Sequence, residues 1–142
     1  MIRLGRRATV PALLLWGTLA AGCCGTRWAT RPEAARGAPP AVAVEQALRL
    51  RRPVLLLFTT PGCALCRRLE QETLADPRVR AHLRGYALVR VDASLAAGKA
   101  LAREHGVEAY PTWVRLAPTG QRLAIHAGHD APEVLLRRLP RP

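Results

Sequence analysis

Apolar residues gather in short runs from residue 41 onward, and their spacing predicts where the strands lie. The run Val54–Phe58 is continuously apolar, which suits a strand buried on both faces of a sheet. Residues 86–91 alternate between apolar and polar positions, as a half-buried strand does. Residues 112–116 and 121–126 predict two further strands joined by a short turn that contains proline and glycine.

Helical spacing appears between these strands. Residues 41–51 carry apolar side chains at near-helical intervals and predict a first helix. A second helix is expected to open at Cys63, with Leu65, Leu69 and Thr73 on one face.

Polar residues mark where three other helices begin. Asp76 precedes a proline, which indicates an N-cap followed by proline in the first turn. Ser94 is placed to cap a helix that runs to residue 105, and Asp130 and Glu133 have the spacing of a capping box for a last helix. The resulting order, α-β-α-β-α-β-β-α, predicts an α/β fold in which helices cover both faces of a central mixed sheet.

The first residues of the chain have the pattern of a secretory signal. Three arginines stand within residues 1–7, and residues 8–21 are uncharged and mostly apolar. Fourteen residues are too few to span a bilayer, which takes roughly 20. A basic start, a short apolar segment and a small-residue end indicate export.

The end of this segment, Leu19-Ala20-Ala21-Gly22-Cys23, resembles a bacterial lipobox. The resemblance implies that Cys23 is lipidated and becomes the mature N-terminus, anchoring the protein to a membrane. An ordinary signal peptide cut near Ala21 is the alternative. Residues 25–40 are rich in proline, glycine and charge, which favours a flexible tether. We therefore expect a signal peptide at 1–22, a lipidated N-terminus and linker at 23–40, and one domain at 41–142.

Composition argues against nucleic-acid binding. The formal net charge is +12, but the basic residues are nearly all arginines that stand in ones and twos along the domain. Phe58 is the only phenylalanine, so aromatic platforms for base stacking are missing from the sequence. An anionic membrane surface is the better match for this charge.

Two cysteines, Cys63 and Cys66, stand directly after the buried run, and three uses of such a pair are possible. A structural zinc site needs four ligands and the pair supplies two; His126 and His129, the only close histidine pair, lie at the far end of the chain. Covalently attached haem needs a histidine after the second cysteine, where Arg67 stands. A structural disulfide at this spacing closes too small a loop to contribute much stability.

Redox chemistry suits the pair best. A cysteine at the first turn of a helix lies beside unpaired N–H groups that favour its thiolate, the nucleophilic form. Cys66 follows one turn later, within reach of a mixed disulfide formed at Cys63. Export would place the pair in an oxidising compartment, where a dithiol needs a supply of electrons.

With these features the chain resembles the thioredoxin family from about residue 41 to 139. The motif PGCALC after the apolar strand is similar to the family's active-site turn, and Tyr110-Pro111-Thr112 is similar to its cis-proline loop. The segment from Cys66 to Leu83 looks most like the C-terminal domain of the periplasmic reductase DsbD and related exported lipoproteins. The resemblance implies a thioredoxin-like fold and thiol–disulfide oxidoreductase activity without a metal or other cofactor.

The resemblance also implies a role for each site residue. Cys63 is the nucleophile and Cys66 the resolving thiol of a redox-active disulfide. Glu70 stands where the DsbD domain has an acidic residue near the cysteines, and it is expected to assist proton transfer. Client proteins are expected to bind around Gly62, Tyr110 and Pro111, with Pro111 in the cis form.

Two positions depart from the family pattern. Gly62 stands where tryptophan is usual, and Leu57 where the family has a buried aspartate that helps deprotonate the resolving thiol. The dipeptide Ala64-Leu65 has no polar group to stabilise a thiolate strongly, which favours a reductase over an oxidant, while Arg67 and Arg68 act weakly in the other direction.

These features predict a membrane-tethered protein-disulfide reductase in the bacterial periplasm, with the inner or outer membrane left open. Its expected partners are a disulfide-containing client protein and a membrane protein that donates electrons, and we expect a monomer. Two alternatives remain: a catalytically weak binding module that docks a client or carries metal, favoured by Gly62 and Leu57, and a disulfide oxidase or isomerase of the same fold.

Overall fold

A four-stranded sheet forms the centre of the computed structural model, which describes residues 39–141. The strand order is β2-β1-β3-β4. The strands are β1 (Val54–Thr59), β2 (Ala87–Asp92), β3 (Thr112–Leu116) and β4 (Arg122–Ala127). β1 pairs with β2 in parallel and with β3 antiparallel, and β3 pairs antiparallel with β4. The predicted mixed sheet is confirmed. The predicted signal segment, Cys23 and the linker up to residue 38 lie outside the described residues.

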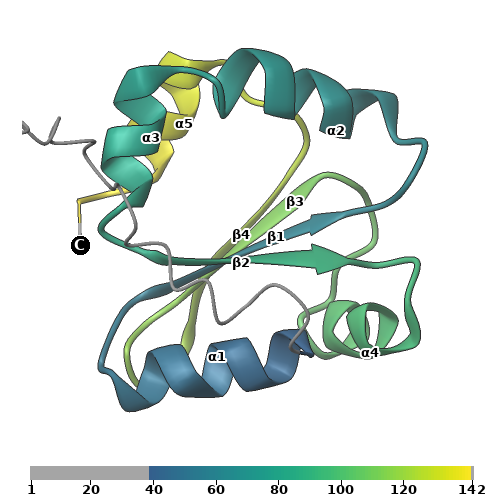
Figure 1. Ribbon diagram of the computed structural model, residues 1–142, viewed down its shortest axis with the longest axis vertical. Helices are drawn as coiled ribbons and strands as arrows, with labels where there is room; N and C mark the ends of the chain where they lie inside the picture. Colours follow the sequence, from purple (N-terminus) through teal and green to yellow (C-terminus); the bar gives the residue numbers. More distant parts are fainter. Residues whose placement is uncertain (1–38, 142) are drawn as a thin grey trace, which may run out of the picture. The chain divides into compact units, whose positions relative to one another are not determined.

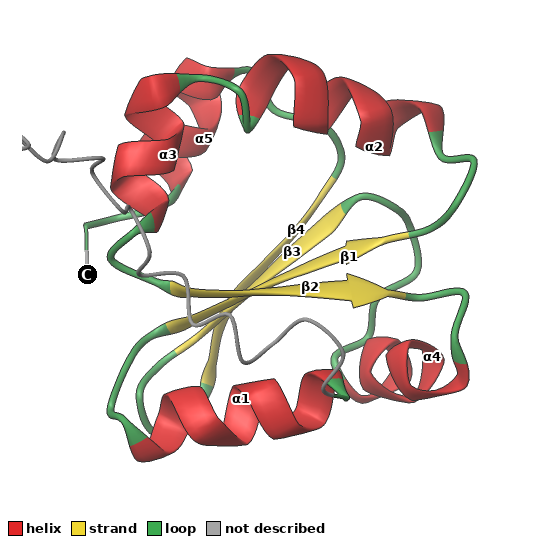
Figure 2. Cartoon of the chain, in the orientation of Figure 1, coloured by secondary structure: helices red, strands yellow, loops and turns green. Residues whose placement is uncertain are grey.

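Helices cover the sheet from both sides (Figures 1 and 2). The helices α1 (Pro40–Arg49) and α4 (Ala96–Glu104) lie on one face. The other face carries α2 (Ala64–Arg68), the π-helix η2 (Leu69–Thr73) that continues it, α3 (Pro77–Leu83) and α5 (Pro132–Arg138). This is the predicted α/β arrangement. Among the described residues, none of the helices is both long and apolar enough to cross a membrane.

The strand β1 is the centre of the core. Val54 to Phe58 are fully buried, as the continuous apolar run predicted. Leu56 and Phe58 pack in the cluster that includes α1 and α4, whereas Leu55 and Leu57 pack in the cluster beneath η2, α3 and α5. Each such side chain stabilises the fold by about 1.5–3 kcal/mol relative to an exposed position, so β1 holds the segment that follows it on a rigid base.

One of the three predicted helix caps is present. The Asp76 carboxylate accepts a hydrogen bond from the Arg78 backbone N–H over 2.7 Å, and α3 begins with proline as expected. The prediction for Ser94 is wrong, because its N–H and hydroxyl both donate to the Asp92 carboxylate while α4 begins at Ala96 without a side-chain cap.

The predicted capping box at the last helix is also wrong. The helix α5 has Ala131 at its N-cap position and no side-chain cap. Asp130 is instead buried, with its carboxylate 2.9 Å from His126 Nε2 and 3.4 Å from Arg138 Nε. Ionic contacts with residues at other positions in the fold have replaced the local capping contact.

Candidate active site

Cys63 caps the helix that carries Cys66. Cys63 has an extended backbone and occupies the N-cap position of α2, and its sulfur accepts a hydrogen bond from the Cys66 N–H over 3.1 Å. The two residues are joined by a disulfide with their Cα atoms 5.2 Å apart. Cys66 is 6% exposed, whereas Cys63 is more open to solvent. In the reduced protein the same N–H would stabilise a Cys63 thiolate.

Gly62 shapes the turn that delivers Cys63. Its φ is +78°, a conformation that side chains other than glycine rarely adopt, and a Cβ there would meet nothing within 4 Å. A side chain at residue 62 would therefore have room, but the left-handed backbone would be strained by any residue other than glycine. The backbone conformation of this turn therefore explains why glycine stands where the family usually has tryptophan.

The loop before β3 lies against the cysteine pair. The Tyr110–Pro111 peptide bond is cis, as the resemblance implied. The Tyr110 carbonyl oxygen is 3.8 Å from Cys63 Sγ. The Pro111 carbonyl accepts a hydrogen bond from the Gly128 N–H over 2.7 Å, and the Thr112 hydroxyl donates to the Ala109 carbonyl over the same distance. These bonds hold the backbone of residue 110 beside the reactive sulfur.

Glu70 lies on η2, one turn after Cys66. Its carboxylate forms an ion pair with the Arg90 guanidinium of β2, and both side chains are partly exposed. Cys66 faces the core, whereas Glu70 lies at the edge of the same helical segment, where it is partly exposed.

The region beneath the active-site helix is apolar where the family has an acid. Leu57 is fully buried in a cluster with Leu69 and Trp113.

Within residues 39–141, no three histidine, cysteine, aspartate or glutamate side chains form a group that could hold a metal ion.

The helical face predicted from residue 63 is wrong at Leu65, which is 45% exposed. Cys66, Leu69 and Thr73 face the core instead. A π-turn follows this segment, in which the Leu74 N–H donates to the Leu69 carbonyl, five residues back. Such a wide turn cannot be read from a spacing of 3.6 residues.

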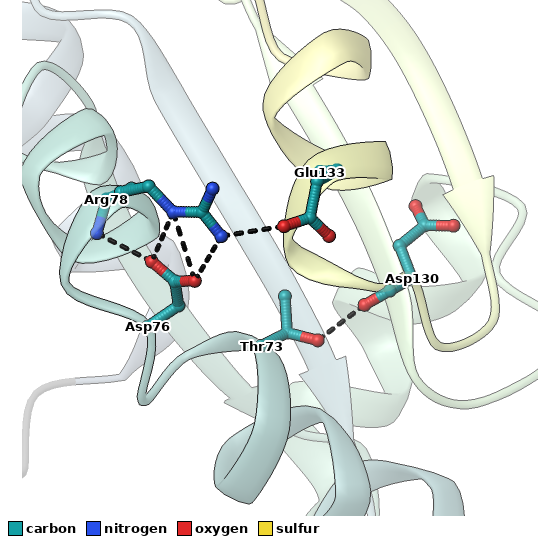
Figure 3. A network of polar contacts seen from close by, with 5 residues as sticks. All are labelled: Thr73, Asp76, Arg78, Asp130 and Glu133. Carbon is teal, nitrogen blue, oxygen red and sulfur yellow. Dashed lines mark hydrogen bonds and ion pairs between the residues drawn. The ribbon is translucent and has the colours of Figure 1, made fainter.

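Sequence reasoning also missed the contacts that hold this helix against the loop before α5. The Thr73 hydroxyl donates to the Asp130 carbonyl (Figure 3), and Glu72 Oε2 lies 3.2 Å from His129 Nε2. Figure 3 also shows Arg78 of α3 between two carboxylates, those of Asp76 and Glu133. Except for Asp76 and Arg78, the partners in these contacts are more than 50 residues apart in the sequence, and no local pattern connects them.

Known proteins place the chain in a family. The thioredoxin-like domain family matches residues 40–140. The chain therefore belongs to the thioredoxin-like domain family, and its fold is the thioredoxin-like fold. A curated relative, protein disulfide isomerase-like 1-3 of rice (Oryza sativa subsp. japonica), is 37% identical over 76 residues. That match covers 53% of this chain but 14% of the rice protein.

Solved structures give the same fold. A thioredoxin from Thermus thermophilus is similar with a TM-score of 0.64 and 25% identity, over 70% of this chain and 80% of that one. The C-terminal domain of DsbD from Neisseria meningitidis, in its reduced form, is similar with a TM-score of 0.60 and 23% identity, over 73% of this chain and 94% of that one. The chain thus has a thioredoxin-like disulfide oxidoreductase fold and carries a Cys63–Cys66 disulfide with CxxC spacing.

Proposed function

We propose that this protein is an exported, membrane-tethered thiol–disulfide oxidoreductase that reduces protein disulfides through Cys63 and Cys66. The observation that carries the proposal is the Cys63 sulfur at the start of α2, with the Cys66 N–H on one side and the Tyr110 carbonyl on the other. A client strand would pair with the backbone of residue 110 while its disulfide meets Cys63.

The reaction is a two-step exchange. The Cys63 thiolate attacks one sulfur of the client disulfide and expels the other as a thiolate, which leaves a mixed disulfide. Cys66 then loses its proton and attacks Cys63 Sγ, which expels the second client sulfur. The client gains two electrons and two protons, and the Cys63–Cys66 disulfide remains. A membrane protein that donates two electrons would return the pair to the dithiol.

The resolving step needs a base, and Glu70 is the proposed one. The family's buried acid is replaced by Leu57, so no carboxylate stands at that position. Glu70 follows Cys66 by four residues, and its ion pair with Arg90 fixes the position of its carboxylate, which would take the proton of Cys66 through water.

The reducing direction rests on the surroundings of Cys63. Ala64 and Leu65 are exposed and offer no polar side chain to the thiolate. Arg68 is paired with Glu72, so its charge is offset, and this leaves Arg67 as the nearby exposed cation. A weakly stabilised thiolate belongs to a reductant rather than to a strong oxidant.

Export and anchoring rest on the sequence alone. The basic and apolar pattern of residues 1–21 and the lipobox-like segment ending at Cys23 support a periplasmic protein held to a membrane by lipid.

A turnover assay tests the activity. The full chain, supplied with a chemical reductant, should reduce a disulfide-bonded reporter peptide over many cycles. The variant Cys63→Ser should abolish turnover, and Cys66→Ser should accumulate a mixed disulfide visible by mass spectrometry. Turnover by Cys63→Ser equal to that of the unaltered chain would refute the assignment.

A docking module that has lost turnover is the second candidate, and the buried Leu57 favours it. This candidate predicts that the unaltered chain binds a client without reducing it, so the same assay would give no product and no trapped adduct.

A further inference from the structure

A cavity lies away from the cysteine pair, between β3, β4 and α5. Its volume is about 200 Å³. Leu55, near the start of β1, forms part of its wall, whereas Cys63 follows the other end of that strand. The exposed residues Ala124 and Ile125 of β4 also line it, so the cavity reaches solvent along the edge strand. The proposed redox reaction uses none of these lining residues.

Two hydrogen-bond donors in its wall have no partner. Trp113 is 3% exposed, and its indole Nε1 forms no hydrogen bond with any described residue. The buried Nε of Arg115 is likewise without an acceptor among residues 39–141. Buried polar groups are nearly always paired, so two orphan donors in the lining of one cavity indicate a missing acceptor.

The charge around the cavity is positive. Arg138 and His126 also line it, but both already contact the Asp130 carboxylate. Its Oδ2 lies 3.4 Å from Arg138 Nε and 2.9 Å from His126 Nε2. The Arg138 guanidinium also lies 3.0 Å from His126 Nδ1. Arg115 forms no ion pair with any described residue. Of the two arginines in the lining, Arg138 is therefore paired with a carboxylate, whereas Arg115 is paired with none among the described residues.

The rest of the wall is apolar. Leu55, Leu135 and Leu139 form it, and each is almost completely buried. Pockets for drug-sized ligands measure about 300–1,000 Å³, so this cavity suits a smaller molecule. Its ligand needs an apolar body and a single acidic head.

We propose that this cavity binds a small organic oxyanion, a carboxylate or phosphate monoester carried on an apolar body, with Arg115 as the residue that holds its charge. The guanidinium fork of Arg115 matches two oxygens of such a head. The Trp113 N–H is the second donor, and the leucines contact the body.

The indole N–H resonance of Trp113 reports binding directly. The full chain would be labelled with ¹⁵N. The Trp113 resonance is then assigned as the indole signal that is absent from the spectrum of the Trp113→Phe variant. The chain would be titrated with 3-phenylpropanoate and with phenyl phosphate, which distinguish the two heads, and with 3-phenylpropanamide as the uncharged match. We expect saturable shifts with at least one of the two anions and affinity at least about tenfold weaker for the amide.

The variant Arg115→Gln should weaken binding of the anion by about tenfold or more. Arg80→Gln is the matched control, since it removes the same charge from an exposed position on α3. Equal binding of amide and anion, or an Arg115→Gln variant that binds as well as Arg80→Gln, would overturn the proposal. If Arg115→Gln does not fold, the comparison of anion with amide on the unaltered chain decides. Resonance shifts that never saturate would also overturn the proposal, because they would mean that water alone fills the cavity.

Discussion

The Cys66 backbone N–H donates to Cys63 Sγ over 3.1 Å, so the second cysteine supplies a hydrogen bond to the first. Because Cys63 is also the N-cap residue of α2, the bond that starts the helix is the bond that would stabilise the thiolate. Helix formation and thiol activation therefore depend on the same atoms.

The two thiols should differ in reactivity. In the reduced protein, iodoacetamide should alkylate Cys63 much faster than Cys66, because Cys63 is the more exposed and its sulfur accepts the N–H bond. Mass spectrometry of partly alkylated chain, with peptide mapping, measures the ratio. Equal labelling of the two cysteines would contradict the assignment of the nucleophile.

The role of Glu70 is testable against its ion-pair partner. Glu70→Gln should slow resolution of a mixed disulfide by about tenfold or more, because it removes the base proposed for Cys66. Arg90→Gln breaks the same ion pair but leaves the carboxylate, and it should slow this step much less. Single-turnover release of client from a trapped mixed disulfide measures the rate. If both variants slow the resolving step equally, the rate depends on the ion pair and not on Glu70 as a base, which would contradict the proposed role.

Restoring the family's tryptophan should cost stability. Gly62→Trp should lower the free energy of unfolding by about 1–2 kcal/mol, because the backbone at residue 62 is left-handed. Leu65→Trp is the control, since it adds the same side chain at an exposed helical position. Urea unfolding compares the two. An unchanged or more stable Gly62→Trp would show that the turn does not require glycine.

Acid should selectively remove the stabilisation supplied by Asp76. The Arg78 side chain hydrogen-bonds to Asp76 and lowers the pKa of its carboxyl from 3.8 to about 2 (Figure 3). Since the folded-state pKa is the lower one, this contribution is complete above the unfolded value and is lost as pH falls toward about 2. The stability difference between the unaltered chain and Asp76→Asn should therefore shrink across that range. Urea unfolding at several pH values measures it, and a constant difference would contradict the assignment.

The sequence predicts well those elements whose cause is local. The strand β1 followed from five consecutive apolar residues, and the start of α3 followed from an aspartate and a proline. The cis form of Pro111 came from a family resemblance rather than from any local pattern.

The errors have a common physical cause. Asp130 has the spacing of a capping residue, but burial beside His126 and Arg138 outweighed the local contact. Leu65 has core spacing but is exposed, because α2 turns Cys66 toward the core instead. Packing in the folded chain decided which side chain is buried at both positions, and the spacing of residue types in a single sequence does not display it.

The reduction potential of the Cys63–Cys66 pair tests the central claim most directly. The full chain would be equilibrated in graded thiol–disulfide buffers with a chelator present, and the fraction of dithiol measured by alkylation and mass spectrometry. A reductase predicts a value near that of thioredoxin, about −270 mV. A value near about −120 mV, typical of a strong oxidant, would contradict it.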